Sequence, residues 1–347
     1  MSTVYQVYSL ESAIADFFTK TSATRLECDA KAQQLAGGQI VPVEIQGDCS
    51  YTVYAGTNYE FVVQFRLRSL ALKTETSTLA SSIYGSLAPR LKFSGQLGSD
   101  GQDEKEPLFI YLINRIRGTT YLEFKLAHDW SSFEACKWRM NTMEDVARFF
   151  ATSWNAPQKV DAAYRRQLRE EFTNDLSRLL SALPHRFHQI IQNCLQSIDD
   201  VLSLPMVLLH RDFGESNIMV DEACHLTGVI DWAEAETRPF GMNLHSIQFL
   251  TGELNFRKGW IPHQDHDVLC CAFWRIFVQA VGVSEDTIRT IKTARIIGLL
   301  LSRGFTSRLA NNPEPIPIGN DERGRYNMLF LDGLLLDPAT KFDGVPS

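Results

Sequence analysis

The sequence lacks the features that mark several common classes of protein. Its seven cysteines are scattered, and no two of them are separated by two residues, so neither a disulfide framework nor a structural zinc site is predicted. It contains no run of about 18 apolar residues, and its first residues show no signal-peptide pattern. We therefore expect a cytoplasmic protein with reduced thiols and no membrane span.

An excess of positive charge is also lacking. The net charge is -7 and the pI is about 5.7, which argues against nucleic acid or an anionic membrane as partner. The hydrophobic content of 44% and the charged content of 22% are those of a globular protein with a substantial core. The 347 residues suggest two structural units, and nothing in the sequence indicates an oligomeric state.

Local patterns change from strands to helices along the chain. A helix is predicted over ESAIADFFTKTS, followed by a polar stretch to residue 35. Between residues 40 and 125, four β-rich segments are separated by turn signals: QIVPVEI, SYTVYAG, EFVVQFRL and LFIYLINRI. A helix over TETSTLASSIYGSLAP, ended by Pro89, is inserted between the third and the fourth. The pattern predicts an antiparallel sheet with one inserted helix.

Helical periodicity dominates after residue 125. It is clear in MEDVARFFATSW, AYRRQLREEFTNDLSRLLSAL and RFHQIIQNCLQSIDDVL. Two short β runs, SNIMV and LTGVI, interrupt it around a turn at Asp221-Glu222. Two polar segments are not expected to form helices or strands. An exposed loop is predicted over Gly98–Pro107, and an irregular segment over NNPEPIPIGNDERG (311–324).

The strongest functional signal is HRDFGESN, residues 210–217, which directly precedes the first of these β runs. Asp212 and Asn217 are five positions apart, and Asp231 follows Asn217 by fourteen, a spacing that fits a two-stranded hairpin. Phosphoryl transfer from ATP needs a carboxylate to orient and deprotonate the acceptor hydroxyl, and hard oxygen ligands for Mg²⁺. We interpret Asp212 as the base and Asn217 and Asp231 as the metal ligands.

A simpler interpretation is that HRDFGESN is a surface loop and Asp231 caps a helix. The flanking strands and the upstream β-rich region, in the order that a kinase requires, favour the catalytic interpretation. His210 and Arg211 are expected to brace the loop. Three nearby acids have no assigned role and could be solvated or contact substrate: Glu215, Glu234 and Glu236.

This region resembles the HxDxxxxN…IDW signature of aminoglycoside phosphotransferases, choline kinases and related small-molecule kinases. The residues that carry the resemblance are LLHRDFGESNIMV and LTGVIDWAEAE. The segments VVQFR, SSIYGSLAP, INRIRGTTY and LDGLLLDP resemble the members of that family abundant in filamentous fungi. The resemblance covers roughly residues 40 to 340 and is most specific over 206–245. Asp-Trp stands where protein kinases carry DFG, and no APE-like segment is present, which favours a small-molecule kinase.

The resemblance implies an α+β, protein-kinase-like fold with two lobes. Residues 1–116 would form a β-rich nucleotide-binding lobe, and 117–347 a mostly helical lobe with the catalytic loop and the acceptor site. In such a fold a glycine-bearing loop covers the phosphates of ATP, and Gly47 and Ser50, in the loop Gln46–Tyr51, are the candidates. A lone glycine between strands is also typical of a plain turn.

The resemblance further implies a cation on the third strand. Gln64 falls at the expected position, and Arg66, two residues on, shares its face. Either Arg66 serves or Gln64 replaces the charge, which would weaken ATP binding. Glu75, at the start of the inserted helix, is the candidate partner of the cation or a simple capping acid. Backbone groups of Asn114 and Ile116 would bind adenine.

The leading hypothesis is therefore an ATP- and Mg²⁺-dependent phosphotransferase acting on a hydroxyl of a small molecule. The acceptor is left open between a hydroxylated metabolite and an amino alcohol, and an aminoglycoside is not favoured because the second lobe is not unusually acidic. Gln64 motivates an alternative, a catalytically degenerate or repurposed kinase fold that binds a nucleotide or metabolite. PHQDHD, residues 262–267, could bind a metal but is better explained as an exposed polar loop.

Overall fold

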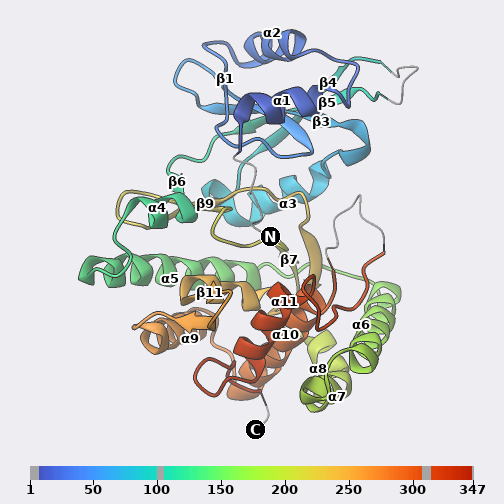
Figure 1. Cartoon of the computed structure of the whole chain (residues 1–347), viewed down its shortest axis with the longest axis vertical. Helices are drawn as coiled ribbons and strands as arrows, with labels where there is room; N and C mark the ends of the chain where they lie inside the picture. Colours follow the sequence, from blue (N-terminus) through green and yellow to red (C-terminus); the bar gives the residue numbers. More distant parts are fainter. Residues whose placement is uncertain (1–7, 100–104, 307–313, 346–347) are drawn as a thin grey trace. The chain divides into compact units, whose positions relative to one another are not determined.

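The computed structural model describes residues 8–99, 105–306 and 314–345. The chain folds into two structural units, Met1–Ile116 and Arg117–Ser347 (Figure 1). The polar segments predicted at 98–107 and 311–324 lie partly outside the described residues. In the part of the chain that the structure describes, every helix is too short or too polar to cross a membrane.

The first unit is built on a five-stranded antiparallel sheet of order β1-β2-β3-β5-β4. Its strands are β1 (Val41–Pro42), β2 (Ser50–Ala55), β3 (Phe61–Leu67), β4 (Leu91–Leu97) and β5 (Leu108–Asn114). Alternation along β3 buries Val63, Phe65 and Leu67 and leaves Gln64 and Arg66 on the other face. Only β4 was not expected from the sequence.

Two helices cover the face of the sheet that carries the core of this unit, α1 (Leu10–Phe18) and α2 (Arg25–Ala36) (Figure 1). Helix α2 was predicted only as a polar stretch, because its apolar residues do not gather on one side. Its start is marked by a capping box in which Thr24 and Glu27 bind each other's backbone N–H. The inserted helix is α3 (Thr74–Tyr84), which ends before Pro89 as predicted.

The second unit is mostly helical, as expected. Its helices are α4 (Tyr121–Ala127), α5 (Phe133–Trp154), α6 (Ala162–Ala182), α7 (His188–Gln196), α8 (Ile198–Ser203), α9 (His266–Val281), α10 (Glu285–Arg303) and α11 (Arg325–Leu335). Its short strands are β6 (Thr119–Thr120), β7 (Met206–Leu209), β8 (Ile218–Val220), β9 (Leu226–Val229), β10 (Glu236–Pro239), β11 (Gly252–Asn255) and β12 (Gly259–Pro262). The predicted hairpin is β8–β9, which β6 extends to three strands.

Aromatic packing supports the HRDFGESN loop. Phe213 is buried against Phe149 and Phe150 of α5, with ring centroids 5.7 and 5.2 Å away. Helix α10 passes so close to the segment after β10 that a Cβ on Gly298 would lie 1.6 Å from the carbonyl oxygen of Met242. The loop therefore rests on tightly packed helices rather than on other loops.

Candidate active site

The hairpin brings the two ends of the candidate catalytic segment together. Ile218 pairs with Val229 in the β8–β9 ladder, and the backbone N–H of Ile230 donates to the carbonyl of Asn217 over 2.9 Å. Asp231 therefore follows a residue that is directly bonded to Asn217. At the other end of the hairpin, the Asp221 side chain accepts from the backbone N–H groups of Ala223 and His225, both at 2.9 Å, which builds the predicted turn.

Asn217 is bonded to the proposed base. Its Nδ2 donates to the carbonyl oxygen of Asp212 over 2.8 Å and to a carboxylate oxygen of Asp212 over 2.9 Å. Asn217 is buried, whereas the Asp212 side chain is exposed. The amide oxygen of Asn217 has no protein partner within the described residues, so this hard ligand atom is left available.

His210 ties the loop to the strand that carries Asp231. Its ring is 2% exposed, and Nε2 donates to the carbonyl of Ile230 over 2.7 Å. Burial lowers the pKa of His210, against the opposing effect of the Ile230 hydrogen bond and of Asp231 and Asp212. The imidazole is therefore neutral at physiological pH, and its role is to brace the site, as predicted from the sequence.

Asp231 adopts an unusual backbone conformation. Its φ of 58° places a non-glycine residue in the left-handed region. The residues on both sides hold it there: Ile230 through its two backbone bonds, and Trp232 through its buried ring, whose Nε1 donates to the Val229 carbonyl over 2.8 Å. Such strained positions are often found at functional sites, and here the strained residue carries an exposed carboxylate.

The donor atoms suit a magnesium ion. Asn217 Oδ1 and the Asp231 carboxylate are hard oxygens on adjacent ends of one hairpin, which matches the preference of Mg²⁺. Asp212 supplies a further exposed carboxylate beside Asn217. We find no group of three or more His, Cys, Asp or Glu with the geometry of a protein-only metal cage in the described ranges, and Mg²⁺ in kinases does not need one because phosphate oxygens complete its shell.

Two of the acids without an assigned role pair with cations. Strand β10 pairs antiparallel with β7, which places Glu236 opposite Leu209. Glu236 then pairs with Arg211 at 3.2 Å and with Arg238 at 2.9 Å. Glu215 pairs with Lys125 of α4 at 3.2 Å, and its pKa is raised by burial despite this cation. Both acids therefore hold the loop in place.

Helix α5 grips the hairpin along its length. Asn141 Nδ2 and Thr142 Oγ1 donate to the carbonyls of Ala223 and Cys224 over 2.9 and 2.6 Å. Asp145 accepts from the backbone N–H of Leu226 over 3.1 Å. Phe149, further along the helix, packs against Phe213 and Trp232. One helix thus supports the turn, the strands and the catalytic loop.

The PHQDHD segment is structural. Asp265 forms a buried ion pair with Arg139, Nε to Oδ2 2.9 Å, and its carbonyl accepts from Leu269 in the first turn of α9. His263 has a pKa lowered to about 4, chiefly by burial and by the positive charge of Arg139. His266 Nδ1 lies 3.3 Å from the carbonyl oxygen of Thr251, and its Nε2 lies 3.7 Å from Cys270 Sγ in the next turn of α9.

In the first unit, the candidate phosphate loop is braced by Gln46. Its buried side chain donates to the carbonyls of Val43 and Thr52 and accepts from the backbone N–H of Thr52. Gly47 and Ser50 lie in the turn before and at the start of β2, and Ser50 Oγ is 3.3 Å from Thr52 Oγ1. The loop is therefore short and fixed at both ends.

Gln64 and Arg66 share one face of β3 and contact each other. Arg66 donates through Nη1 to Gln64 Oε1 at 3.4 Å and through Nε to the Leu70 carbonyl at 2.9 Å. Gln64 Nε2 lies 3.4 Å from Thr52 Oγ1 on β2. Glu75 is exposed in the first turn of α3, and no ion pair joins it to Arg66 among the residues described.

The candidate adenine segment follows β5. The N–H of Asn114 donates to the Arg90 carbonyl over 3.0 Å, and that of Arg115 to the Glu60 carbonyl over 2.9 Å. Ile116 comes directly afterwards, and its backbone N–H and C=O have no partner in the described part of the chain. Of the two predicted residues, Ile116 thus keeps both backbone groups available.

One charged residue that interacts electrostatically with Asp212 was missed in the sequence. It is Arg303, the last residue of α10, whose pKa is lowered by burial while the negative charge of Asp212 acts to raise it. It follows the apolar run Ile296–Leu301, and a cation in the last turn of a helix is usually explained by the helix dipole. The sequence offered one signal, the aromatic residues of α11, because two of them, Tyr326 and Phe330, lie next to Arg303.

A family model described as "Phosphotransferase enzyme family" matches residues 83–259, which is 177 of 347 residues and therefore more than half of the chain. The chain belongs to the phosphotransferase enzyme family. The match spans the catalytic loop and the hairpin, and it confirms both the family resemblance and the predicted class of enzyme. No curated protein sequence matches this phosphotransferase.

Solved structures confirm the predicted α+β, protein-kinase-like fold. A type I macrolide 2′-phosphotransferase is 16% identical, with a TM-score of 0.50 over 81% of this chain and 91% of its own. The apoenzyme of macrolide 2′-phosphotransferase MphH from Brachybacterium faecium has a TM-score of 0.51 at 16% identity and the same coverage. The GDP complex of aminoglycoside 2′-phosphotransferase-IIIa has a TM-score of 0.50 at 14% identity, and the match again covers 81% of this chain and 91% of its own. At such low identity these similarities concern the fold.

Proposed function

We propose that this phosphotransferase transfers the γ-phosphoryl group of ATP to a hydroxyl of a small molecule, with Asp212 as the base and Asn217 and Asp231 as ligands of Mg²⁺. The observation that carries the proposal is the hydrogen-bonded link between Asp212 and Asn217. It joins a base to a metal ligand inside a segment that the family model covers.

Each residue has a role that its surroundings suit. The exposed Asp212 carboxylate can accept the proton of an acceptor hydroxyl, and Asn217 holds one of its oxygens so that the other can face the acceptor. Asn217 Oδ1 and the Asp231 carboxylate would hold the metal. A Mg²⁺ ion held there would supply positive charge that offsets the negative charge developing on the transferred phosphoryl group. Positioning and electrostatics then supply most of the acceleration.

Residues 1–116 would bind the nucleotide, and 117–347 would carry the catalytic loop and the acceptor site. Gly47 and Ser50 would lie at the phosphates, and Ile116, with Asn114, at the adenine. We assign the phosphate-binding cation to Arg66, since it is already bonded to Gln64 on the same face, with Glu75 as a nearby acid. A GDP complex among the solved structures of similar fold supports a nucleotide as the donor.

Calorimetry of ATP binding tests the metal role. The wild type should bind ATP in the presence of Mg²⁺ and much more weakly with EDTA, whereas Asp231→Ala should bind equally weakly under both conditions. Asp221→Asn, in the turn of the same hairpin, removes a charge but keeps an oxygen acceptor for the turn and serves as the matched control. Mg²⁺-dependent binding that survives in Asp231→Ala would disprove the assignment, and absence of binding by the wild type would favour a repurposed fold.

A further inference from the structure

Arg303 is enclosed by aromatic rings. Its guanidinium carbon lies 4.8 Å from the ring centroid of Phe330, 5.6 Å from Tyr326 and 5.8 Å from Phe249. Its Nη1 is 3.5 Å from Asn327 Oδ1. Helix α10 presents the arginine, while α11 and the turn Leu244–Leu250 supply the rings. The rings favour a cation through their negative faces, but they cannot neutralise its charge.

The positive charge of Arg303 lacks a carboxylate partner. Within the residues that the structure describes, no Asp or Glu oxygen approaches its guanidinium within ion-pair distance. Burial lowers the pKa of Arg303, and Tyr326 and Asp212 act in the opposite direction. Taking a cation out of water is costly unless a counter-charge is supplied. The arrangement is therefore that of an anion-binding group awaiting its anion.

The neighbouring histidine does not change this balance. The pKa of His245 is lowered to about 3 by burial and by the positive charges of Arg303, Arg295 and Arg211. It is neutral at physiological pH, so it offers a hydrogen bond without adding charge. Of these arginines, Arg211 already pairs with Glu236. Neither Arg303 nor Arg295 has such a partner in the described ranges, and Arg303 is the one whose pKa, lowered by burial, the charge of Asp212 acts to raise.

A row of aromatic rings connects Arg303 with the surface. Phe256 is 58% exposed and lies 5.8 Å from Tyr326, which is 39% exposed and lies 5.1 Å from Phe330. Phe330 in turn lies 5.3 Å from Phe249. Such a wall suits a flat, apolar body of a ligand. The charge at its inner end is positive rather than acidic.

We propose that Arg303 binds an anionic group, a carboxylate or a phosphate, on an acceptor whose hydroxyl lies at Asp212. This inference rests on the proposed function, because it takes Asp212 as the base. A planar guanidinium forms paired, charge-assisted hydrogen bonds with such groups. The surrounding rings exclude water and so strengthen these bonds. The acceptor class is then a hydroxylated acid rather than an amino alcohol, for which the same arginine would be repulsive.

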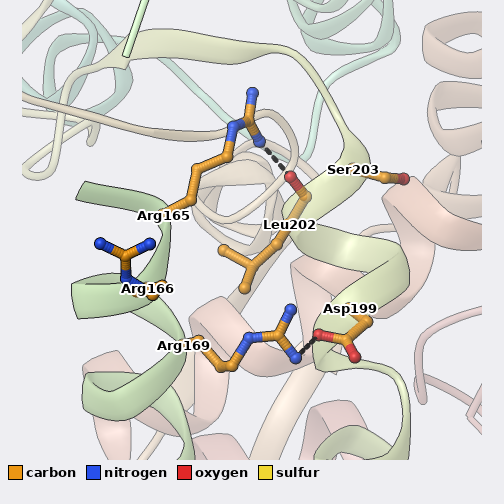
Figure 2. A pocket seen from close by; sticks show the side chains of 6 residues that line it. All are labelled: Arg165, Arg166, Arg169, Asp199, Leu202 and Ser203. Carbon is orange, nitrogen blue, oxygen red and sulfur yellow. Dashed lines mark hydrogen bonds and ion pairs between the residues drawn. The ribbon is translucent and has the colours of Figure 1, made fainter. Parts of the chain in front are cut away.

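Another arginine cluster in this unit does not have these properties. Arg165, Arg166 and Arg169 line a surface pocket of about 370 Å³ between α6 and α8 (Figure 2). Arg165 donates to the carbonyl of Leu202, and Arg169 pairs with Asp199. Arg166 lines the same pocket, is exposed, and forms no hydrogen bond or ion pair with the residues around Asp212 in the described part of the chain. Arg166→Gln is therefore a suitable control for the loss of a positive charge.

A matched series of ligands tests the inference. The probes are para-(hydroxymethyl)benzoate, para-(hydroxymethyl)phenylphosphonate, benzene-para-dimethanol and para-(aminomethyl)benzyl alcohol, which share body and hydroxyl and differ in the charge at the far end. Binding to the full chain is measured by calorimetry. We expect one of the two anions to bind at least about tenfold more tightly than the diol, and the amine to bind worst. The preferred anion distinguishes a carboxylate from a phosphate.

Two variants place the effect at this arginine. Arg303→Gln should abolish the preference for the anion, Arg303→Lys should restore part of it, and Arg166→Gln should leave it unchanged. Thermal unfolding shows whether each variant is folded. If Arg303→Gln does not fold, the comparison of Arg303→Lys with the wild type still tests the preference for the anion. Equal binding of all four probes, no binding of any, or a preference that persists in Arg303→Gln would overturn the inference. Mg²⁺-dependent ATP binding, measured separately, shows whether the proposed function fails as well.

Discussion

The side-chain amide of Asn217 donates to both the carbonyl and the carboxylate of Asp212, over 2.8 and 2.9 Å. A residue proposed to bind the metal thus also orients the proposed base. His210 extends the link, since it bonds to the carbonyl of Ile230, the residue before Asp231. One connected set of hydrogen bonds therefore links Asp212 and Asn217 to the residue that precedes Asp231.

Asp212→Asn should separate catalysis from binding. The new amide can still accept a hydrogen bond from Asn217, but it cannot take a proton from the acceptor. We expect kcat to fall by roughly 10²- to 10⁴-fold, with the affinity for Mg²⁺ and ATP nearly unchanged. Single-turnover kinetics and calorimetry measure the two quantities. Asp221→Asn should show neither change, and a kcat for Asp212→Asn within a factor of a few of wild type would exclude the base role.

Arg66 and Gln64 can be distinguished by their effect on ATP affinity. If Arg66 provides the charge, Arg66→Gln should weaken ATP binding by about tenfold or more, and Gln64→Ala by less. Lys92→Gln is the control, because Lys92 pairs with Leu112 and so lies on the opposite face of the same sheet. A larger loss from Gln64→Ala than from Arg66→Gln would assign the phosphate contact to Gln64 instead.

His210 should make stability depend on pH in a defined direction. Its pKa is lower in the folded protein than the ordinary value of 6.5. At a pH well above 6.5 the ring is neutral in both the folded and the unfolded state, so it adds no pH dependence to the stability. As the pH falls below 6.5, His210 of the unfolded chain binds a proton, whereas His210 of the folded protein stays neutral. The free energy of unfolding should then decrease by up to ~1.4 kcal/mol per pH unit for this one group.

Urea unfolding of wild type and His210→Gln, at several pH values between about 5.5 and 7.5, isolates this effect. The glutamine amide can still donate to the Ile230 carbonyl but does not titrate. We expect the slope of stability against pH to be shallower in the variant by about one proton. Other buried histidines, such as His263, contribute equally to both proteins and cancel. Identical slopes would show that His210 does not resist protonation.

Gly298→Ala should destabilise the second unit. The added Cβ would lie 1.6 Å from the Met242 carbonyl oxygen, and neither backbone can move without displacing α10 or the segment that leads to His245. We expect a loss of about 3 kcal/mol or more in the free energy of unfolding. Ser302→Ala, at an exposed position of the same helix, should change it little. An unfolding temperature equal to that of wild type would contradict this close contact.

The hairpin and the loop could be predicted because their signals are local. Apolar runs on both sides of Asp221-Glu222 and fixed spacings between functional residues are properties of one short segment. Helix α2 was missed because its helical pattern is weak, although the capping pair Thr24 and Glu27 could have revealed its start. Strand β4 was missed because none of its residues is buried and its pairing with β5 is interrupted by a register shift after Phe93, so its sequence shows no regular apolar alternation.

Arg303 could not be found in the same way. The rings around it, Phe249 and Tyr326, come from two separate segments, and the charge of Asp212 acts on it from a third. No spacing in a single sequence reveals this arrangement. The partners of Glu215 and Glu236 were hidden for the same reason, since Lys125 lies 90 residues from Glu215 along the chain. Local chemistry thus pointed to the proposed base and metal ligands, whereas the surroundings of the acceptor required tertiary structure.

The grip of α5 on the β8–β9 hairpin has a consequence for local opening. Because Asn141, Thr142 and Asp145 hold the turn while Phe149 packs against the loop, the hairpin cannot separate from the helix one contact at a time. In native-state hydrogen exchange, the amides of Ile218, Val220 and Val229 should therefore exchange as slowly as those in the middle of α5, and with the same free energy of opening. The segment proposed to carry the chemistry would then belong to the last part of the protein to come apart.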